Sequence, residues 1–324
     1  MTRPWQPSAS PAAIRMRAAV NARIRAFFAE RGVLEVETPI LSRAGNSDPN
    51  IESLTTHLNG PTAGAPGPRW LRTSPEFAIK RLLSAGIGDC YELGRVFRDG
   101  ESGTRHTPEF TMLEWYRLGW DHRRLMHEVA ELVTTVLAER GRSLRVQALS
   151  YHDLFDQRFG FNPHRAGIAT LRQPLADLRI DPEGLERSDW LDLLMSHRIQ
   201  PDLPPDTLTL VYDFPAEQCA LARLRPGEPP VAERFEAYLG PLELANGFHE
   251  LADAKEQRAR FLADQSRRRS RKQPVPELDT ALLAALEHGL PACAGVALGV
   301  DRLLMALLET DDIGQCLAFS SSRA

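Results

Sequence analysis

The chain has 324 residues, of which 43% are hydrophobic and 25% charged, the balance of a soluble globular enzyme with one large domain or two small ones. Its formal net charge of −4 excludes a general electrostatic attraction to nucleic acid, so any contact with RNA would need a local basic patch. The N-terminal segment lacks an apolar h-region and no run of about 18 uncharged apolar residues occurs, so we expect neither secretion nor a membrane span.

The cysteines indicate a reducing compartment. They stand far apart, with no CxxC pair, at Cys90, Cys219, Cys293 and Cys316. This spacing argues against both a zinc site and a disulfide framework. We therefore expect reduced packing residues in a cytoplasmic protein.

The first element that the sequence predicts is a helix over residues 11–31. Apolar side chains recur at helical spacing over Val20–Phe28, and Gly32 is placed to end the helix. A short strand over residues 33–36 follows and runs towards Pro39. By itself, this helix and strand are equally well explained by plain core packing.

A strand over residues 69–73 and a second helix come next. The preceding segment Asn59–Pro68 is rich in glycine and proline and predicts a loop. Ser74, Pro75 and Glu76 form a favourable helix start, with serine as N-cap, proline at the first helical position and glutamate near the positive end of the dipole. Capping alone is a sufficient explanation for these three residues.

The segment around Arg98 is dense in functional side chains. A predicted strand over Tyr91–Phe97 ends at Arg98, where a polar loop begins. In the strand that follows, a period of two places Phe110, Glu114 and Tyr116 on one face. For a lone arginine or glutamate, a structural ion pair is the commoner explanation. The density of such residues in this short stretch favours a binding surface.

The middle of the chain is expected to be scaffold. An amphipathic helix is predicted over residues 121–141, with Asp121 as its N-cap. From about residue 150 to 205 the pattern is helical and polar, with Trp190 and Leu194 as buried anchors. This segment contains no motif that indicates chemistry.

A hairpin is expected in the last third of the chain. Strands are predicted over residues 208–214 and 231–238, and the second of these leads into the hairpin turn. Gly240-Pro241 suits a two-residue turn that pairs Tyr238 with Glu243. In that register Glu236 and Glu243 lie diagonally on one face, about 7 to 8 Å apart at their Cα atoms. From spacing alone, a solvated or ion-paired carboxylate is a better explanation than a shared cation.

Two further features lie near the end of the chain. A helix predicted over residues 253–272 ends in a basic run, for which a solvated helix end is the first explanation and docking of an acidic macromolecule the second. The segment Gly295–Arg302 leads from a strand into a helix, and its glycine residues allow the backbone to approach a ligand closely.

Taken in order, these motifs resemble those of the class II aminoacyl-tRNA synthetases in their lysyl-type form. Residues 94–120 are similar to motif 2 of that family, and GVALGVDR at residues 295–302 is similar to motif 3. The helix and strand up to Pro39 resemble motif 1, which forms the dimer interface of the family. ELANGFHEL at residues 243–251 is also a close match, and the resemblance covers nearly the whole chain.

The resemblance implies roles for individual residues. Arg98 would be the catalytic ligand of the ATP α-phosphate, because a planar guanidinium binds phosphate oxygens bidentately. Phe110 and Arg302 would contact the nucleotide from opposite sides, and Glu236 and Glu243 would hold magnesium against the phosphates. The other residues implied for ATP are Asp99, Gly100, Thr107, Leu244 and Gly299. Those implied for the amino-acid substrate are Ser74, Glu76, Glu114, Tyr116, Asn246, Ala297 and Glu250, the last facing the side-chain ammonium.

The chain departs from the lysyl-type pattern at four positions. Gly100 replaces the glutamate of FRNE, with Glu101 adjacent, and Thr107 replaces the asparagine of HNPEF. Ser74 stands where lysyl-tRNA synthetases usually carry alanine, and Ala297 where they tend to carry glycine. One methyl group is enough to reshape the floor of a packed amino-acid pocket.

This combination resembles the truncated lysyl-type enzymes that ligate (R)-β-lysine to elongation factor P. It implies ATP-dependent activation of (R)-β-lysine and its transfer to the ε-amine of a lysine of that factor, without tRNA. It also implies one class II catalytic domain over residues 1–324, with a helical insertion at about 150–205 and no N-terminal anticodon-binding OB domain. The expected fold is α+β, a mixed or antiparallel six-stranded sheet flanked by helices, in a homodimer. Two alternatives remain, a stand-alone lysyl-type aminoacyl-tRNA synthetase and a non-catalytic paralogue that acts as a binding module.

Overall fold

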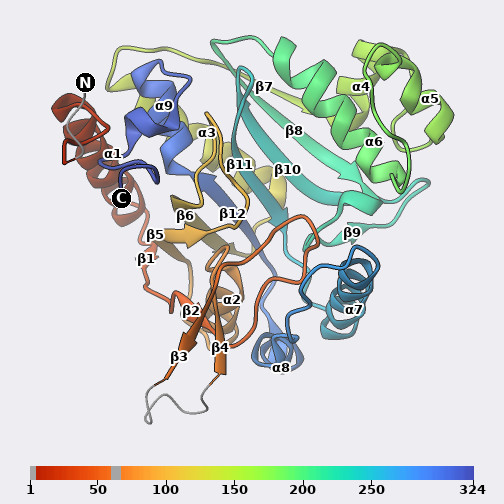
Figure 1. Cartoon of the computed structure of the whole chain (residues 1–324), viewed down its shortest axis with the longest axis horizontal. Helices are drawn as coiled ribbons and strands as arrows, with labels where there is room; N and C mark the ends of the chain where they lie inside the picture. Colours follow the sequence, from red (N-terminus) through yellow and green to blue (C-terminus); the bar gives the residue numbers. More distant parts are fainter. Residues whose placement is uncertain (1–4, 60–66) are drawn as a thin grey trace. The chain divides into compact units, whose positions relative to one another are not determined.

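The fold comes from a computed structural model that describes residues 5–59 and 67–324 (Figure 1). Most of the predicted loop Asn59–Pro68 therefore lies outside the described residues. The chain divides into two units, which are described in turn. The first consists of Met1–Gly119, Ala252–Ala292 and Ala297–Ala324, and the second of Trp120–Leu251 and Cys293–Val296.

The first unit holds five α-helices within its described residues, three strands of the main sheet, and a small separate sheet. The helices are α1 (Pro11–Ala29), α2 (Glu76–Ser84), α7 (Ala254–Ser270), α8 (Thr280–Gly289) and α9 (Val300–Leu308). The strands of the main sheet are β1 (Leu34–Glu35), β5 (Cys90–Phe97) and β6 (Glu109–Leu118). The small sheet has the order β2-β4-β3, formed by Leu41–Ser42, Gly67–Leu71 and Thr55–Leu58.

The second unit combines a helical layer with long strands. Its helices are α3 (His122–Ala138), α4 (Tyr151–Phe159), α5 (Ile168–Arg172) and α6 (Arg187–Leu194). Its strands are β7 (Arg145–Ser150), β8 (Thr207–Pro215), β9 (Leu224–Arg225), β10 (Val231–Leu239) and β11 (Leu242–His249). Strand β12 (Cys293–Gly299) contributes residues to both units.

The main sheet is mixed and has nine strands in the part of the chain that the structure describes. Their order is β1-β5-β6-β12-β11-β10-β8-β7, with β9 paired to β10. β1 is parallel to β5 and β7 to β8, whereas β5–β6, β8–β10 and β10–β11 are antiparallel. The expectation of a mixed α+β fold was confirmed, but the expected count of six strands was wrong. The count of six came from the family resemblance. Strand β1 lies within the short strand predicted over residues 33–36, whereas the two-residue strand β9 is too short to give a periodic signal.

The predicted helices α1 and α3 are confirmed within a few residues of their expected ends. Asp121 caps α3, with its carboxylate accepting a hydrogen bond from the backbone N–H of Arg124 at 2.8 Å. In the first unit, Phe28 of α1 stacks on Tyr91 and meets Trp115 edge-on, with ring centroids 4.4 and 5.4 Å apart. These rings fix α1 against β5 and β6. Among the described residues, no helix combines the length and apolar character needed to cross a bilayer.

The segment at residues 150–205 is helical, as predicted. Both expected anchors, Trp190 and Leu194, are buried. They join a cluster in which Tyr151 stacks on Phe155 and packs against Phe214 of β8. Figure 1 shows α4, α5 and α6 gathered in green beside β7 and β8. The apolar face of this helical layer is therefore covered by the strands of its own unit.

Helix α2 begins one residue later than predicted. Pro75 is the N-cap residue, and Glu76 is the first helical residue. The Ser74 hydroxyl accepts a hydrogen bond from the backbone N–H of Glu76 at 3.0 Å, and it also donates to Glu114 Oε2 at 2.7 Å. Capping therefore explains only part of what Ser74 does.

The basic run at the end of α7 is not solvated throughout. Arg268 is 1% exposed, and its guanidinium donates to the Glu52 carboxylate at 2.8 Å. It also donates to the backbone carbonyls of Ser47, Asp48, Ile51 and Pro274. The expectation of a solvated helix end was wrong for this residue, because its side chain faces the loop at residues 47–52 and not water. Its neighbours Arg267 and Arg269 are exposed.

Candidate active site

Arg98 follows the end of β5. Its backbone N–H donates to the Pro108 carbonyl at 2.9 Å, which holds it beside the start of β6. The guanidinium carbon lies 5.2 Å from the centroid of the Phe110 ring. Its nitrogens lie 3.4 Å from the Thr73 carbonyl and from the Glu101 carboxylate. These hydrogen bonds are long and therefore weak, so the guanidinium can exchange them for an anion.

A buried carboxylate network lies on β6 and at the start of α2. Glu114 accepts hydrogen bonds from the Tyr116 hydroxyl at Oε1 and from the Ser74 hydroxyl at Oε2, both at 2.7 Å. Glu76 pairs with Lys80 Nζ at 2.6 Å. The predicted alternation is confirmed for Glu114 and Tyr116, whose side chains meet. Four of the residues predicted to bind the amino-acid substrate thus lie in one group.

The ionisation of Glu114 depends on the charges around it. Burial raises the pKa of Glu114 to about 7, and the negative charge of Glu76 adds to this effect. Hydrogen bonds from Tyr116 and Ser74 oppose the rise, as does the positive charge of Lys80. A cation placed beside such a carboxyl favours its ionised form. The network therefore suits a ligand that carries an ammonium group.

Glu92 is a buried carboxylate that sequence reasoning missed. It is the direct partner of Glu114 across β5 and β6, which brings two carboxyls onto adjacent strands. Arg72 lies 2.5 Å from it, and Thr38 donates from its backbone and its hydroxyl at 3.1 and 2.7 Å. The charge of Arg72 reduces the repulsion between the two carboxyls. No local sequence pattern indicates a partner so distant in the chain.

Asp301 is a second buried residue that was missed. It ties the start of α9 to β6, because it accepts a hydrogen bond from the backbone N–H of Thr111 at 2.6 Å and forms an ion pair with Arg17 of α1. This fixes the backbone next to Arg302. The guanidinium of Arg302 in turn contacts His106 Nε2 at 2.7 Å. The only signal in the sequence was its position beside Arg302.

The other predicted nucleotide residues of this unit lie in loops and at a helix end. Gly100 has φ +76, a left-handed conformation that glycine adopts readily and that a glutamate would adopt only with strain. Asp99 is exposed and accepts a hydrogen bond from the backbone N–H of Gly100, and Thr107 is buried. Gly299 is the N-cap of α9, and Ala297 is half-buried in β12.

In the second unit, β10 and β11 form the hairpin that carries the predicted magnesium ligands. The two-residue turn pairs Tyr238 with Glu243, as predicted. Gly240 has φ +53, and a Cβ atom there would lie 3.0 Å from the Cα of Pro205. The turn therefore requires glycine for its conformation and its close packing.

A bulge follows this turn and was not predicted. Glu236 pairs with Asn246, where an unbroken register would pair it with Ala245. The extra residue is Leu244, and it shifts the alternation of side chains by one position. Glu243 and Asn246 therefore lie on the same face as Glu236, although an odd number of positions separates them in the chain. The bulge therefore places these three predicted residues on one face of the hairpin, whereas a regular strand would place Glu243 and Asn246 on opposite faces.

Glu236 is buried and held from both sides. Arg234 forms an ion pair with Oε1, and the Tyr238 hydroxyl donates to Oε2. Arg234 also donates to Asn246 Oδ1 at 3.1 Å. Burial raises the pKa of Glu236 to about 7 despite the positive charge of Arg234, and the negative charge of Glu243 contributes to the rise.

The donor set on this face fits a magnesium ion. Each carboxylate oxygen has two lone pairs, so each oxygen of Glu236 keeps an acceptor position beyond its present partner. Magnesium takes oxygen ligands from one or two carboxylates and leaves its other positions to phosphate and water. Glu243 supplies the second carboxylate. The last two predicted residues of this unit, Leu244 and Glu250, are both buried.

Comparison with known proteins gives one consistent result. A family model described as tRNA synthetases class II (D, K and N) matches residues 6–323. The chain is 45% identical over 324 residues to the elongation factor P–(R)-beta-lysine ligase of Vibrio cholerae, covering 99% of this chain and 98% of that protein. It is 46% identical over 327 residues to the protein of the same name from Klebsiella pneumoniae, covering 100% and 99%. The corresponding protein of Edwardsiella ictaluri is 44% identical over 323 residues, covering 99% and 98%.

Proposed function

The chain belongs to the class II tRNA synthetases (D, K and N), and from this membership we propose that it is an ATP-dependent ligase that attaches (R)-β-lysine to elongation factor P. The observation that carries this proposal is an identity of 44–46% over nearly the full length with relatives named for that reaction. In the proposal, residues 1–324 act as one catalytic domain, with residues 150–205 as a helical insertion.

The first step forms an adenylate. A carboxylate oxygen of β-lysine forms a bond to the α-phosphorus of ATP, the bond from that phosphorus to the bridging oxygen breaks, and pyrophosphate leaves. Arg98 binds the α-phosphate oxygens and stabilises their charge, while Phe110 and Arg302 hold the nucleotide. Glu236 and Glu243 hold magnesium, which offsets phosphate charge when bound. Positioning and electrostatics suffice, and no protein nucleophile is needed.

The carboxylates support an amino-acid substrate with two ammonium groups. Lysine isomers carry both groups at neutral pH, and each needs an acidic partner when water is displaced. Glu114, in the network with Ser74 and Tyr116, is assigned to the amino group near the reacting carboxyl. Glu250 is assigned to the side-chain ammonium.

The second step forms an amide. The ε-amine nitrogen of a lysine of elongation factor P attacks the carbonyl carbon of the adenylate, the bond to the phosphate oxygen breaks, and AMP leaves as the amine loses a proton. We include in the proposal a homodimer that uses α1 and the segment up to Pro39, as the similarity to motif 1 implies. A cytoplasmic location follows from the acceptor, because translation takes place there.

The test is the intact mass of elongation factor P after incubation with the protein, ATP, magnesium and (R)-β-lysine. We expect the mass to rise by one lysyl group, with no charging of tRNA in a parallel aminoacylation assay. Charged tRNA with an unchanged factor would instead support a stand-alone synthetase. If neither acceptor changes, the proposed acceptor is wrong, and ATP–pyrophosphate exchange then decides whether the chain activates an amino acid at all.

A further inference from the structure

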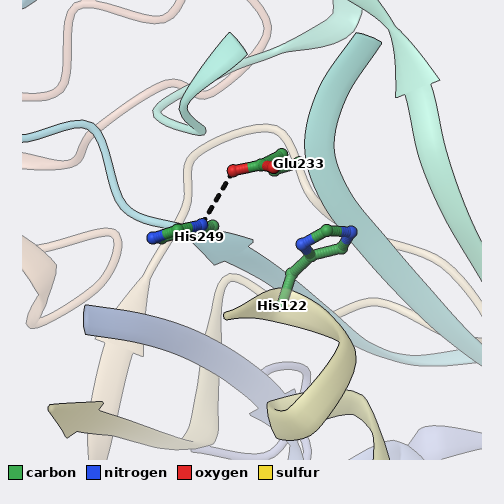
Figure 2. A group of neighbouring side chains, drawn as sticks. All are labelled: His122, Glu233 and His249. Carbon is green, nitrogen blue, oxygen red and sulfur yellow. Dashed lines mark ion pairs between the residues drawn. The ribbon is translucent and has the colours of Figure 1, made fainter. Parts of the chain in front are cut away.

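Three side chains from distant parts of the second unit meet at one point (Figure 2). His122 is the first residue of α3, Glu233 lies in β10 and His249 is the last residue of β11. One possible ligand atom from each lies within 4.8 Å of the other two. The register between β8 and β10 shifts beside Glu233, and such bulges are common next to functional sites.

His122 presents a buried nitrogen to this group. Its Nε2 atom contacts Asp213 Oδ1 at 3.0 Å, while its Nδ1 atom is buried and has no hydrogen-bond partner. Figure 2 shows one ring nitrogen of His122 on the side of Glu233 and His249. A carboxylate on the far nitrogen is the usual partner of a metal-binding imidazole, because it fixes the tautomer and the ring orientation.

The other two residues contribute atoms of the same kind. His249 Nδ1 forms an ion-pair contact of 2.7 Å with Glu233 Oε2, drawn as a dashed line in Figure 2. The two groups are not oriented for a hydrogen bond, and neither atom has another hydrogen-bond partner. Ligand atoms about 2.1 Å from a tetrahedral zinc ion stand about 3.4 Å apart, which small side-chain rotations would give here. Three buried atoms that can each offer a lone pair to a cation, and that have no hydrogen-bond partner, thus converge. From this convergence we propose that His122, Glu233 and His249 bind a divalent transition-metal ion of the Zn²⁺ class, with water as the fourth ligand.

The donor types select the metal. Two imidazoles and one carboxylate suit zinc and its neighbours, whereas magnesium and calcium prefer oxygen ligands throughout. The site is also distinct from the face that carries Glu236. His249 lies an odd number of positions beyond Asn246 on a regular part of β11, so its side chain points to the opposite face. The inference therefore does not rest on the proposed function.

The competing explanation is an ion-pair network without metal. Arg223 Nε lies 3.3 Å from Glu233 Oε2, and Arg225 lies 3.6 Å from Oε1 while it also pairs with Asp213 at 2.6 Å. The Arg223 side chain is 53% exposed, so it can turn into water when an ion enters. Arg225 stays with Asp213. The nearby positive charge weakens the binding of a cation, so we expect moderate affinity and not that of a zinc finger.

The experiment uses untagged protein, stripped with a chelator and dialysed against low-micromolar Zn²⁺ in the presence of excess Mg²⁺. We expect one equivalent of zinc per chain, and we expect Co²⁺ to give the visible absorption of a four-coordinate site. His249→Ala, His122→Ala and the isosteric Glu233→Gln should each weaken binding at least tenfold. His127→Ala is the matched control, because His127 is an exposed histidine on the same helix, α3.

Thermal unfolding of each metal-free variant establishes that it is folded before binding is compared. Zinc should raise the melting temperature of the wild type and of His127→Ala, and not that of His249→Ala. The proposal is overturned if the wild type binds no stoichiometric zinc, or if the three variants bind it as tightly as His127→Ala. The cluster would then be the ion-pair network alone, and the ligase assay would be unaffected by that result.

Discussion

Glu114→Gln tests whether ionisation of the buried Glu114 carboxyl destabilises the folded protein. The pKa of Glu114 is raised from 4.5 to about 7, and one pKa unit corresponds to about 1.4 kcal/mol, so ionisation costs the folded protein about 3 kcal/mol. Between these two values the folded chain binds a proton that the unfolded chain has lost. The free energy of unfolding therefore falls as the pH rises through this window, and the full loss is reached above about pH 7. Glutamine keeps the shape of the glutamate side chain and does not ionise, so the variant does not lose this stability as the pH rises.

Urea unfolding at several values between pH 4.5 and 8, followed by tryptophan fluorescence, measures the difference. We expect the stability of the variant, relative to the wild type at the same pH, to increase by about 3 kcal/mol across this range. Any constant offset from altered hydrogen bonds to Ser74 and Tyr116 cancels in this comparison. Glu109→Gln, at an exposed position on the same strand, is the control and should follow the wild type. Parallel profiles for Glu114→Gln and the wild type would refute the reasoning.

Three further predictions concern the proposed site and the fold. Arg98→Ala should lower the rate of ATP–pyrophosphate exchange by about 10²- to 10³-fold, and Arg98→Lys should recover part of it. Arg95→Ala, at an exposed position in β5, is the control and should be near wild type. Equal rates in all of them would show that Arg98 has no role in adenylate formation. EDTA should abolish ATP–pyrophosphate exchange in the wild type. Glu243→Gln should raise the magnesium concentration needed for half-maximal exchange by about tenfold. An unchanged magnesium concentration would mean that Glu243 is not a magnesium ligand. Arg268→Met should lower the free energy of unfolding by about 3 kcal/mol, because it leaves the Glu52 carboxylate and four backbone carbonyls without their donor. Arg267→Met, at an exposed position, should change the free energy of unfolding little. Similar denaturant midpoints for the two variants would contradict the structural role of Arg268.

The sequence predicted local structure well where the signal is local. The cap at Asp121, the strand that ends at Arg98 and the two-residue turn at Gly240 each follow from the conformations that a few adjacent residues allow. The alternation that brings Glu114 and Tyr116 together follows from the period of a strand in the same way. The family resemblance, and not periodicity, gave the class of fold.

The features that were missed depend on partners far away in the chain. Nothing near Glu92 indicates Arg72, and nothing in a run of arginines shows that Arg268 is buried against a loop more than two hundred residues earlier. The bulge at Leu244 has no glycine or proline to mark it. Charge and helical position describe a residue's own chemistry, whereas burial depends on what packs against it.

The hairpin of β10 and β11 limits which changes in chain length the protein can accept. Its turn has two residues, one of which is a glycine with positive φ packed tightly against Pro205, and its single bulge already uses one extra residue to bring Glu243 and Asn246 to the same face. Inserting or deleting one residue between Gly240 and Asn246 would turn one of these side chains away from Glu236. A pair of compensating changes, one on each side of Leu244, would restore the arrangement. Natural variation in this segment should therefore consist of substitutions, and single-residue length differences should be found in loops elsewhere in the chain.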